Sequence, residues 1–186
     1  MTKKIIIAGI LGGITLMIYT FIGNGILRFN VSINMKQIKE EQLVYETLKE
    51  TIVEPGRYIC NPQLTADERF PEDEPVFSIL YGGVGHEAAG ILMLIGLIVY
   101  ILTPIIGAWL LSQTSGEVLN SYGKKVLFFV AIGLLIALFT DLTRYGIGDY
   151  PFGNVLLLAI NHIITWTLVG LVVAWRMKPG KEAKPD

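Results

Sequence analysis

Four long apolar segments alternate with polar ones along the chain, at residues 5–27, 88–111, 126–146 and 150–175. Each is long enough for the roughly 20 apolar residues that a bilayer-spanning helix needs. Formal charge occurs only in the third segment, at Asp141 and Arg144. The pattern predicts an all-α membrane protein, a four-transmembrane-helix bundle in which spans 2–4 follow one another closely within residues 88–176.

A polar insert, residues 28–87, separates the first apolar segment from the other three. From Met35 its apolar residues recur at helical spacing until Glu54-Pro55-Gly56, where proline and glycine should end the helix. Residues 57–60 and 76–81 have strand composition and flank an acidic loop. The insert is therefore predicted to be a small α+β cap whose two strands pair antiparallel. Because so small a unit buries little apolar surface, we expect it to dock on the bundle or on a partner.

Composition and charge support a membrane location and predict an orientation. Of 186 residues, 52% are hydrophobic and only 17% charged. The segments 1–4, 112–125 and 176–186 together carry a net charge of +5, and the insert carries −5. Because cytoplasmic segments near span ends collect Lys and Arg, both termini should be cytoplasmic, with 177–186 as a cytoplasmic tail and the insert extracytoplasmic. The first span, in residues 1–27, is expected to stay as an anchor, and the charge pattern provides no surface for nucleic acid.

The insert also carries a short motif, Glu54-Pro55-Gly56-Arg57-Tyr58. With one span before it and a variable loop, a strand and three spans after it, the chain resembles a family of small four-span bacterial inner-membrane proteins with an extracytoplasmic Glu-Pro-Gly-x-Tyr insert. The resemblance covers nearly the whole chain. It implies a bacterial inner-membrane location and this layout of spans, and it implies no catalytic residue.

Glycines at helical spacing indicate where spans should pack. Gly9 and Gly13 share one face of the first span, Gly96 lies on a small-residue stripe of the second, and Gly133 precedes Ala137 and Asp141 on the third. Small residues let helix backbones approach closely in a membrane. These faces are expected to contact neighbouring helices, a membrane protein partner or a second copy of the chain.

Ionisable groups inside spans are costly, by roughly 2.5 to 3.5 kcal/mol each on insertion scales, and are therefore functional candidates. They are Asp141, Arg144 and His162, with the polar Asn161 beside the histidine. Counting about 1.5 Å per residue from the expected span ends puts Asp141 roughly 7 Å and His162 roughly 18 Å below the outer surface. His86 and Glu87 lie at the outer mouth of the second span. The candidates are thus expected to be spread in depth.

Three interpretations of these residues remain open. Asp141 and Arg144 can form an i,i+3 ion pair while Asn161 and His162 hydrogen-bond between helices. His86 and His162 can ligate haem, or join Glu87 and Asp141 at a metal, although their difference in depth opposes this. Asp141 and His162 can instead lie on a proton or solute path.

No catalytic motif is present, and the lone Cys60 excludes the Cys-x-x-Cys chemistry of small membrane thiol oxidoreductases. The role expected first is therefore a non-catalytic accessory or scaffold subunit of a membrane protein complex, or a self-associating membrane protein. The alternative is a transport or proton-conducting element that uses Asp141 and His162. A haem- or metal-binding protein is the third hypothesis. No cofactor is predicted, with haem or lipid as the open options.

Overall fold

The computed structural model describes residues 2–34, 36–69, 71–83, 90–148 and 150–177. Within these residues four helices are long and apolar enough to cross a membrane, as the hydropathy pattern predicted. The first consists of α1 (Lys3–Thr20) and the π-helical segment η1 (Phe21–Ile26), and the second is α4 (Ile91–Ser112). The third consists of α6 (Tyr122–Ile136), the π-helical segment η2 (Ala137–Leu142) and α7 (Thr143–Gly148). The fourth is α8 (Phe152–Arg176). Two short helices, α2 (Phe29–Asn34) and α5 (Gly116–Asn120), adjoin them.

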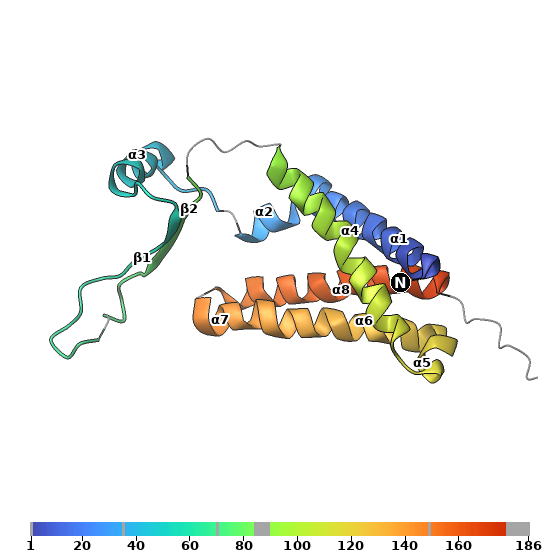
Figure 1. Cartoon of the computed structure of the whole chain (residues 1–186). Coiled ribbons are helices and arrows are strands. Elements are labelled where there is room, and N and C mark those ends of the chain that lie inside the picture. The colour runs from blue at the N-terminus through green and yellow to red at the C-terminus, as the bar shows by residue number, and fades with distance from the viewer. Residues whose placement is uncertain (1, 35, 70, 84–89, 149, 178–186) are drawn as a thin grey trace, which may run out of the picture. The chain divides into compact units, whose positions relative to one another are not determined.

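The long helices form two pairs, α1 with α4 and α6 with α8, joined mainly by contacts between α1 and α8 (Figure 1). A cluster of buried hydrophobic side chains lies at the end of the bundle that contains Arg176. It draws side chains from all four helices, and these are Ile5, Ala8, Ala108, Leu111, Phe129, Trp166, Val169 and Val173. Towards the Phe152 end the α4 side chains are mostly exposed, because α4 has few contacts with α6 or α8 there. The bundle is therefore tightly packed at one end and more open at the other.

Three of the four glycines predicted to pack do so within the chain itself. A Cβ on Gly9 would lie 2.4 Å from the Ile105 Cα, and one on Gly13 would lie 2.9 Å from the Ile101 Cα, so only glycine lets α1 approach the α4 backbone. Gly133 lies similarly close to the α8 backbone, with Ile163 Cα 3.1 Å from the ideal Cβ. Gly96 has open space around it.

A buried lysine joins α6 to the end of α8. Lys125 is 2% exposed, and its Nζ donates a hydrogen bond to the backbone carbonyl of Met177, 2.6 Å away. The last carbonyls of a helix lack partners within the helix and carry partial negative charge, which a cation stabilises. This contact fixes the register of α6 and α8 at the Arg176 end.

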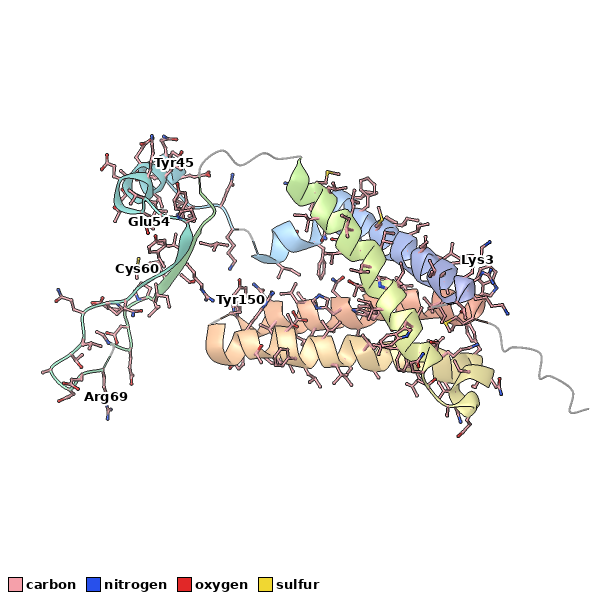
Figure 2. All side chains as sticks on the ribbon, viewed as in Figure 1. Lys3, Tyr45, Glu54, Cys60, Arg69 and Tyr150 are labelled. Atoms are coloured by element: carbon pink, nitrogen blue, oxygen red, sulfur yellow. The ribbon has the colours of Figure 1, made fainter. Side chains whose placement is uncertain are left out.

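The insert forms a second compact unit, residues 37–90. Its strands β1 (Gly56–Cys60) and β2 (Phe77–Tyr81) pair antiparallel, as predicted, with Tyr58 opposite Ile79. The helix prediction was correct in kind but began too early. Helix α3 spans Glu41–Thr51, and Glu40 before it has a left-handed backbone (φ 57°), so an irregular segment precedes the helix. Figure 2 shows Tyr45 on α3 and Cys60 at the end of β1, where the thiol is exposed.

Candidate functional site

The candidate site is a buried carboxylate and a partly exposed imidazole that meet between two of the long helices. Asp141, in η2, has a fully buried side chain. Its Oδ2 lies 2.5 Å from Nδ1 of His162, which comes from the middle of α8 and has a side chain one-third exposed. The two atoms share a hydrogen bond, in which the role of the imidazole nitrogen depends on its tautomer. Residues 21 positions apart in the chain thus form one unit.

The predicted separation of Asp141 and His162 in depth was wrong. The third helix continues to Gly148 and the fourth begins at Phe152, so both expected span ends were misplaced by two residues. In addition, helical side chains lean towards the N-terminus of their own helix. Because α6–η2 and α8 run antiparallel, Asp141 leans away from the Phe152 end and His162 leans towards it. These two displacements act in opposite directions along the bundle and bring the two side chains to the same depth.

The predicted ion pair between Asp141 and Arg144 is not formed by these two residues. The carboxylate contacts His162 instead, and the guanidinium carbon of Arg144 lies 5.8 Å from the centre of the Tyr150 ring. A π-helical turn bonds residue i to i+5 and is wider than an α turn, so a residue three positions on lies elsewhere around the helix. Arg144 thus leaves the face that buries Asp141 and makes a cation–π contact near the Phe152 end.

The second oxygen of Asp141, Oδ1, is buried and has no hydrogen-bond partner among the described residues. An ionised carboxylate in an apolar region needs a compensating positive charge or donor. A single proton on the His162 imidazole turns the pair from a net charge of −1 to zero. The pair therefore has the composition of a one-proton site that is neutral when loaded, and Oδ1 has capacity for a further donor.

Asn161, beside His162, is held by a different helix. The hydroxyl of Tyr19 on α1 donates a hydrogen bond to Asn161 Oδ1, 2.7 Å away. Further along α8, Asn154 Nδ2 donates to the backbone carbonyl of Ile33 in α2 at 2.8 Å. Sequence reasoning did not single out Tyr19 or predict α2. The available signal for Tyr19 was a hydroxyl within an apolar span, because a buried tyrosine usually needs a polar partner.

The haem and metal interpretations depended on His86 and Glu87, which lie outside the described residues. Within the part of the chain that the structure describes, no three His, Cys, Asp or Glu side chains lie close enough to hold a metal ion together. His162 Nδ1 is already engaged by Asp141. The described geometry thus assembles a two-residue acid–base pair.

Comparison with family models, with curated proteins and with solved structures finds no match to this chain.

Proposed function

We propose that the chain is a multi-pass membrane protein that takes up and releases a proton at the Asp141–His162 pair, as part of a transport or proton-conducting process. The observation that carries this proposal is the 2.5 Å contact between His162 and a fully buried carboxylate inside two membrane-length helices. Groups of this kind are expensive in a membrane and mark proton and ion pathways.

Two further observations support a proton as the species handled. Histidine is a common proton acceptor and donor in proteins, and its imidazole here contacts a carboxylate that can share the proton. The carboxylate lies in η2, and π-helical turns within α-helices frequently occur at functional sites. The unpartnered Oδ1 leaves one side of the carboxylate available to a water molecule or a substrate donor.

The direct test is proton flux in liposomes that contain the purified full-length chain and a trapped pH-sensitive dye. We expect an imposed pH gradient to collapse faster than in protein-free liposomes. Asp141→Asn keeps the shape of the side chain but removes its charge, and His162→Gln keeps an N–H donor but does not titrate. Both variants should return the flux to the protein-free level.

Thr140→Val is the matched control, because Thr140 lies in the same π-helical segment and its side chain is exposed. This variant should conduct as the wild type does. Size-exclusion profiles should be the same for all four proteins, so that a change in flux reports on chemistry and not on assembly. Wild-type flux at the protein-free level, or undiminished flux in Asp141→Asn, would overturn the proposal.

An accessory or scaffold role is the second candidate, and α4 is the observation that favours it. Gly96 has open space around it, and large apolar side chains nearby are exposed, among them Met93 at 60%. A small residue on an apolar helix face is the surface that membrane helices use to associate. Under this hypothesis Gly96→Leu should dissociate a complex or homo-oligomer that native mass spectrometry detects in mild detergent, and Asp141→Asn should not.

For both candidates we propose the bacterial inner membrane as the location, with cytoplasmic termini and an extracytoplasmic insert. The charge difference between the insert and the other polar segments supports this orientation.

A further inference from the structure

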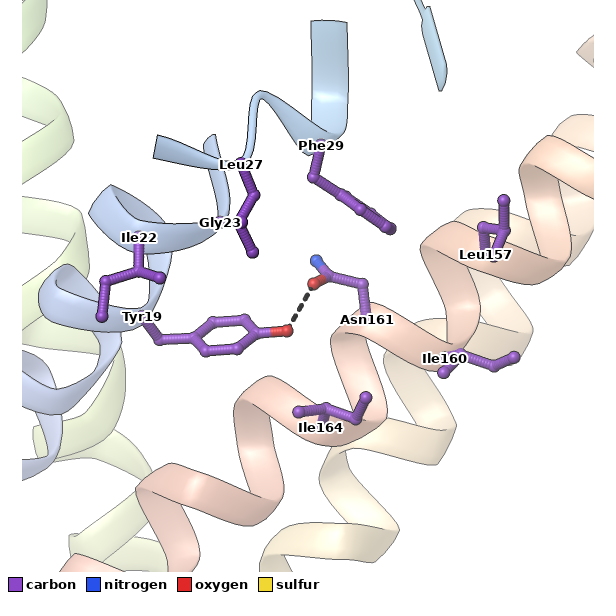
Figure 3. Close-up of a pocket in the computed structure, with 9 residues that line it drawn as sticks. All are labelled: Tyr19, Ile22, Gly23, Leu27, Phe29, Leu157, Ile160, Asn161 and Ile164. Atoms are coloured by element: carbon purple, nitrogen blue, oxygen red, sulfur yellow. Dashed lines mark hydrogen bonds between the residues drawn. The ribbon is translucent and has the colours of Figure 1, made fainter. Parts of the chain in front are cut away.

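A second site lies on another face of α8, between α8, η1 and α2 (Figure 3). It is a cavity of about 150 Å³ whose walls are almost wholly apolar. The lining residues are Tyr19, Ile22, Gly23, Leu27, Phe29, Leu157, Ile160, Asn161 and Ile164. His162 and Asp141 do not line it, so this cavity is independent of the proposed proton site.

The irregular backbone after α1 creates the cavity. The chain leaves α1 through the wider η1 turn and then changes direction at Arg28, which has a left-handed backbone (φ 52°). This places Leu27 and Phe29 opposite α8, and the hydrogen bond from Asn154 to Ile33 holds α2 against the same helix. If α1 continued straight, Leu27 and Phe29 would not cover this part of α8.

One polar group that faces the cavity has a hydrogen-bond donor without an acceptor among the described residues. The carbonyl oxygen of the Asn161 amide accepts the Tyr19 hydroxyl, whereas no described residue accepts a hydrogen bond from the Asn161 Nδ2. Figure 3 shows that the amide nitrogen points to the side of the cavity where Leu27 and Phe29 lie. An apolar cavity with one aimed donor fits an apolar ligand that carries one hydrogen-bond acceptor.

The volume of the cavity and the depth of Asn161 restrict the class of ligand that can bind. An apolar cavity of about 150 Å³ is large enough for a benzene-sized ring. Asn161 lies nine residues along α8 from Phe152, or about 13 Å at 1.5 Å per residue, which is near the middle of a hydrocarbon core about 30 Å thick. The ester groups of bilayer lipids lie at the edge of that core. At this depth a carbonyl of a molecule dissolved within the bilayer reaches Asn161 more readily than a lipid ester does.

We propose that this cavity binds the ring of a membrane-dissolved carbonyl compound of the quinone type. A ring carbonyl accepts the hydrogen bond from Asn161 Nδ2, and the ring packs among Phe29, Leu157 and Ile160. The isoprenoid or alkyl tail of such a molecule extends between the open ends of the helices into lipid. The proposal concerns binding alone and includes no electron transfer.

The test uses the full-length chain in lipid nanodiscs with an azidoquinone photolabel, and decylubiquinone as the competitor. Label should concentrate on peptides that contain Tyr19–Phe29 and Leu157–Ile164, and excess decylubiquinone should remove it. Asn161→Leu should weaken competition by about three- to tenfold, as loss of one hydrogen bond predicts. Leu157→Trp fills the cavity and should abolish the label there.

Leu156→Trp is the matched control, since Leu156 and Leu157 are 44% and 45% exposed but only Leu157 lines the cavity. It should leave the label unchanged. Thermal unfolding of each variant confirms that it folds. Equal labelling of the exposed α4 surface, or equal effects of the two tryptophans, would overturn the proposal. So would a photoreactive phosphatidylcholine that labels the same residues and displaces decylubiquinone, because the cavity would then hold an acyl ester.

Discussion

The two helix pairs of the bundle leave regular α-helical geometry in similar places and with different results. In the α1–α4 pair, η1 buries none of its residues and leads into the apolar cavity beside α8. In the α6–α8 pair, η2 buries Ala137 and Asp141 and brings the carboxylate onto His162. The same backbone deviation thus makes room for an apolar ligand in one pair and positions a charge in the other. Whether a π turn opens a cavity or positions a charged side chain therefore depends on the elements that pack against it.

The pairs also differ in what holds them together. Gly9 and Gly13 bring α1 against the α4 backbone, so that contact depends on shape alone. Between α6 and α8, Gly133 allows a similar approach, and polar contacts are added: Lys125 with the Met177 carbonyl at the Arg176 end, and Asp141 with His162 near the middle of α8. Substitutions should therefore destabilise the α1–α4 pair through steric overlap, and the α6–α8 pair also through the loss of polar contacts.

Removing one residue from each π segment gives the largest expected contrast. Deleting Thr140 from η2 should convert the wide turn to an α turn and rotate Asp141 away from His162. Breaking a buried pair costs about 3 to 5 kcal/mol. Deleting Asn24 from η1, where no residue is buried, should displace α2 and break the hydrogen bond between Asn154 and Ile33. The free energy of unfolding should then fall by about 1 kcal/mol. Unfolding in mixed SDS micelles measures both, and equal losses would contradict the distinction between the segments.

Asp141→Ala should lower the free energy of unfolding by about 2 to 3 kcal/mol, because it removes a hydrogen bond to a charged group. Asp141→Asn retains an oxygen that can accept from His162 Nδ1, so its loss should be below about 1 kcal/mol. The same micelle titration compares them. If alanine and asparagine cost the same, the amide oxygen of asparagine does not replace the carboxylate as an acceptor for His162.

Gly9→Ala should cost about 1 to 3 kcal/mol, the usual range for overpacking, because its Cβ would lie 2.4 Å from the backbone of Ile105. Gly96→Ala is the matched control on α4. With open space around Gly96, alanine should be neutral or stabilise the helix by up to about 1 kcal/mol. Thermal unfolding in detergent measures the difference, and a tolerated Gly9→Ala would contradict the close approach of the α1 and α4 backbones.

Tyr19→Phe should lower the free energy of unfolding by only about 1 kcal/mol, since it removes only the hydrogen bond to Asn161. Tyr100→Phe is the control, because the Tyr100 hydroxyl makes no hydrogen bond to another described residue and its loss should be close to neutral. The phenylalanine at position 19 also leaves the Asn161 amide free to turn. Quinone labelling in that variant should weaken without disappearing, whereas complete loss would show that Tyr19 contacts the ligand itself.

Local patterns predicted the elements well because each depends on residues close in the chain. Long apolar segments predicted the four helices, and two segments of strand composition on either side of an acidic loop predicted β1 and β2 with their antiparallel pairing. The start of α3 was missed, because an amphipathic pattern runs back to Met35 although the helix begins only at Glu41. Short helix α2 was missed too, since its stability depends on contacts such as that of Ile33 with Asn154 on α8.

For the candidate site, too, one part could be predicted from local sequence and another could not. The sequence by itself determined that Asp141 and His162 are unusual, because any ionisable group is conspicuous in an apolar span. Only the tertiary structure decided that they meet, since this depends on where α7 ends, on the wide turn of η2 and on the opposite leans of side chains on antiparallel helices. The cavity likewise belongs to the tertiary structure. Its walls come from segments more than a hundred residues apart in the chain, and no local pattern records their proximity.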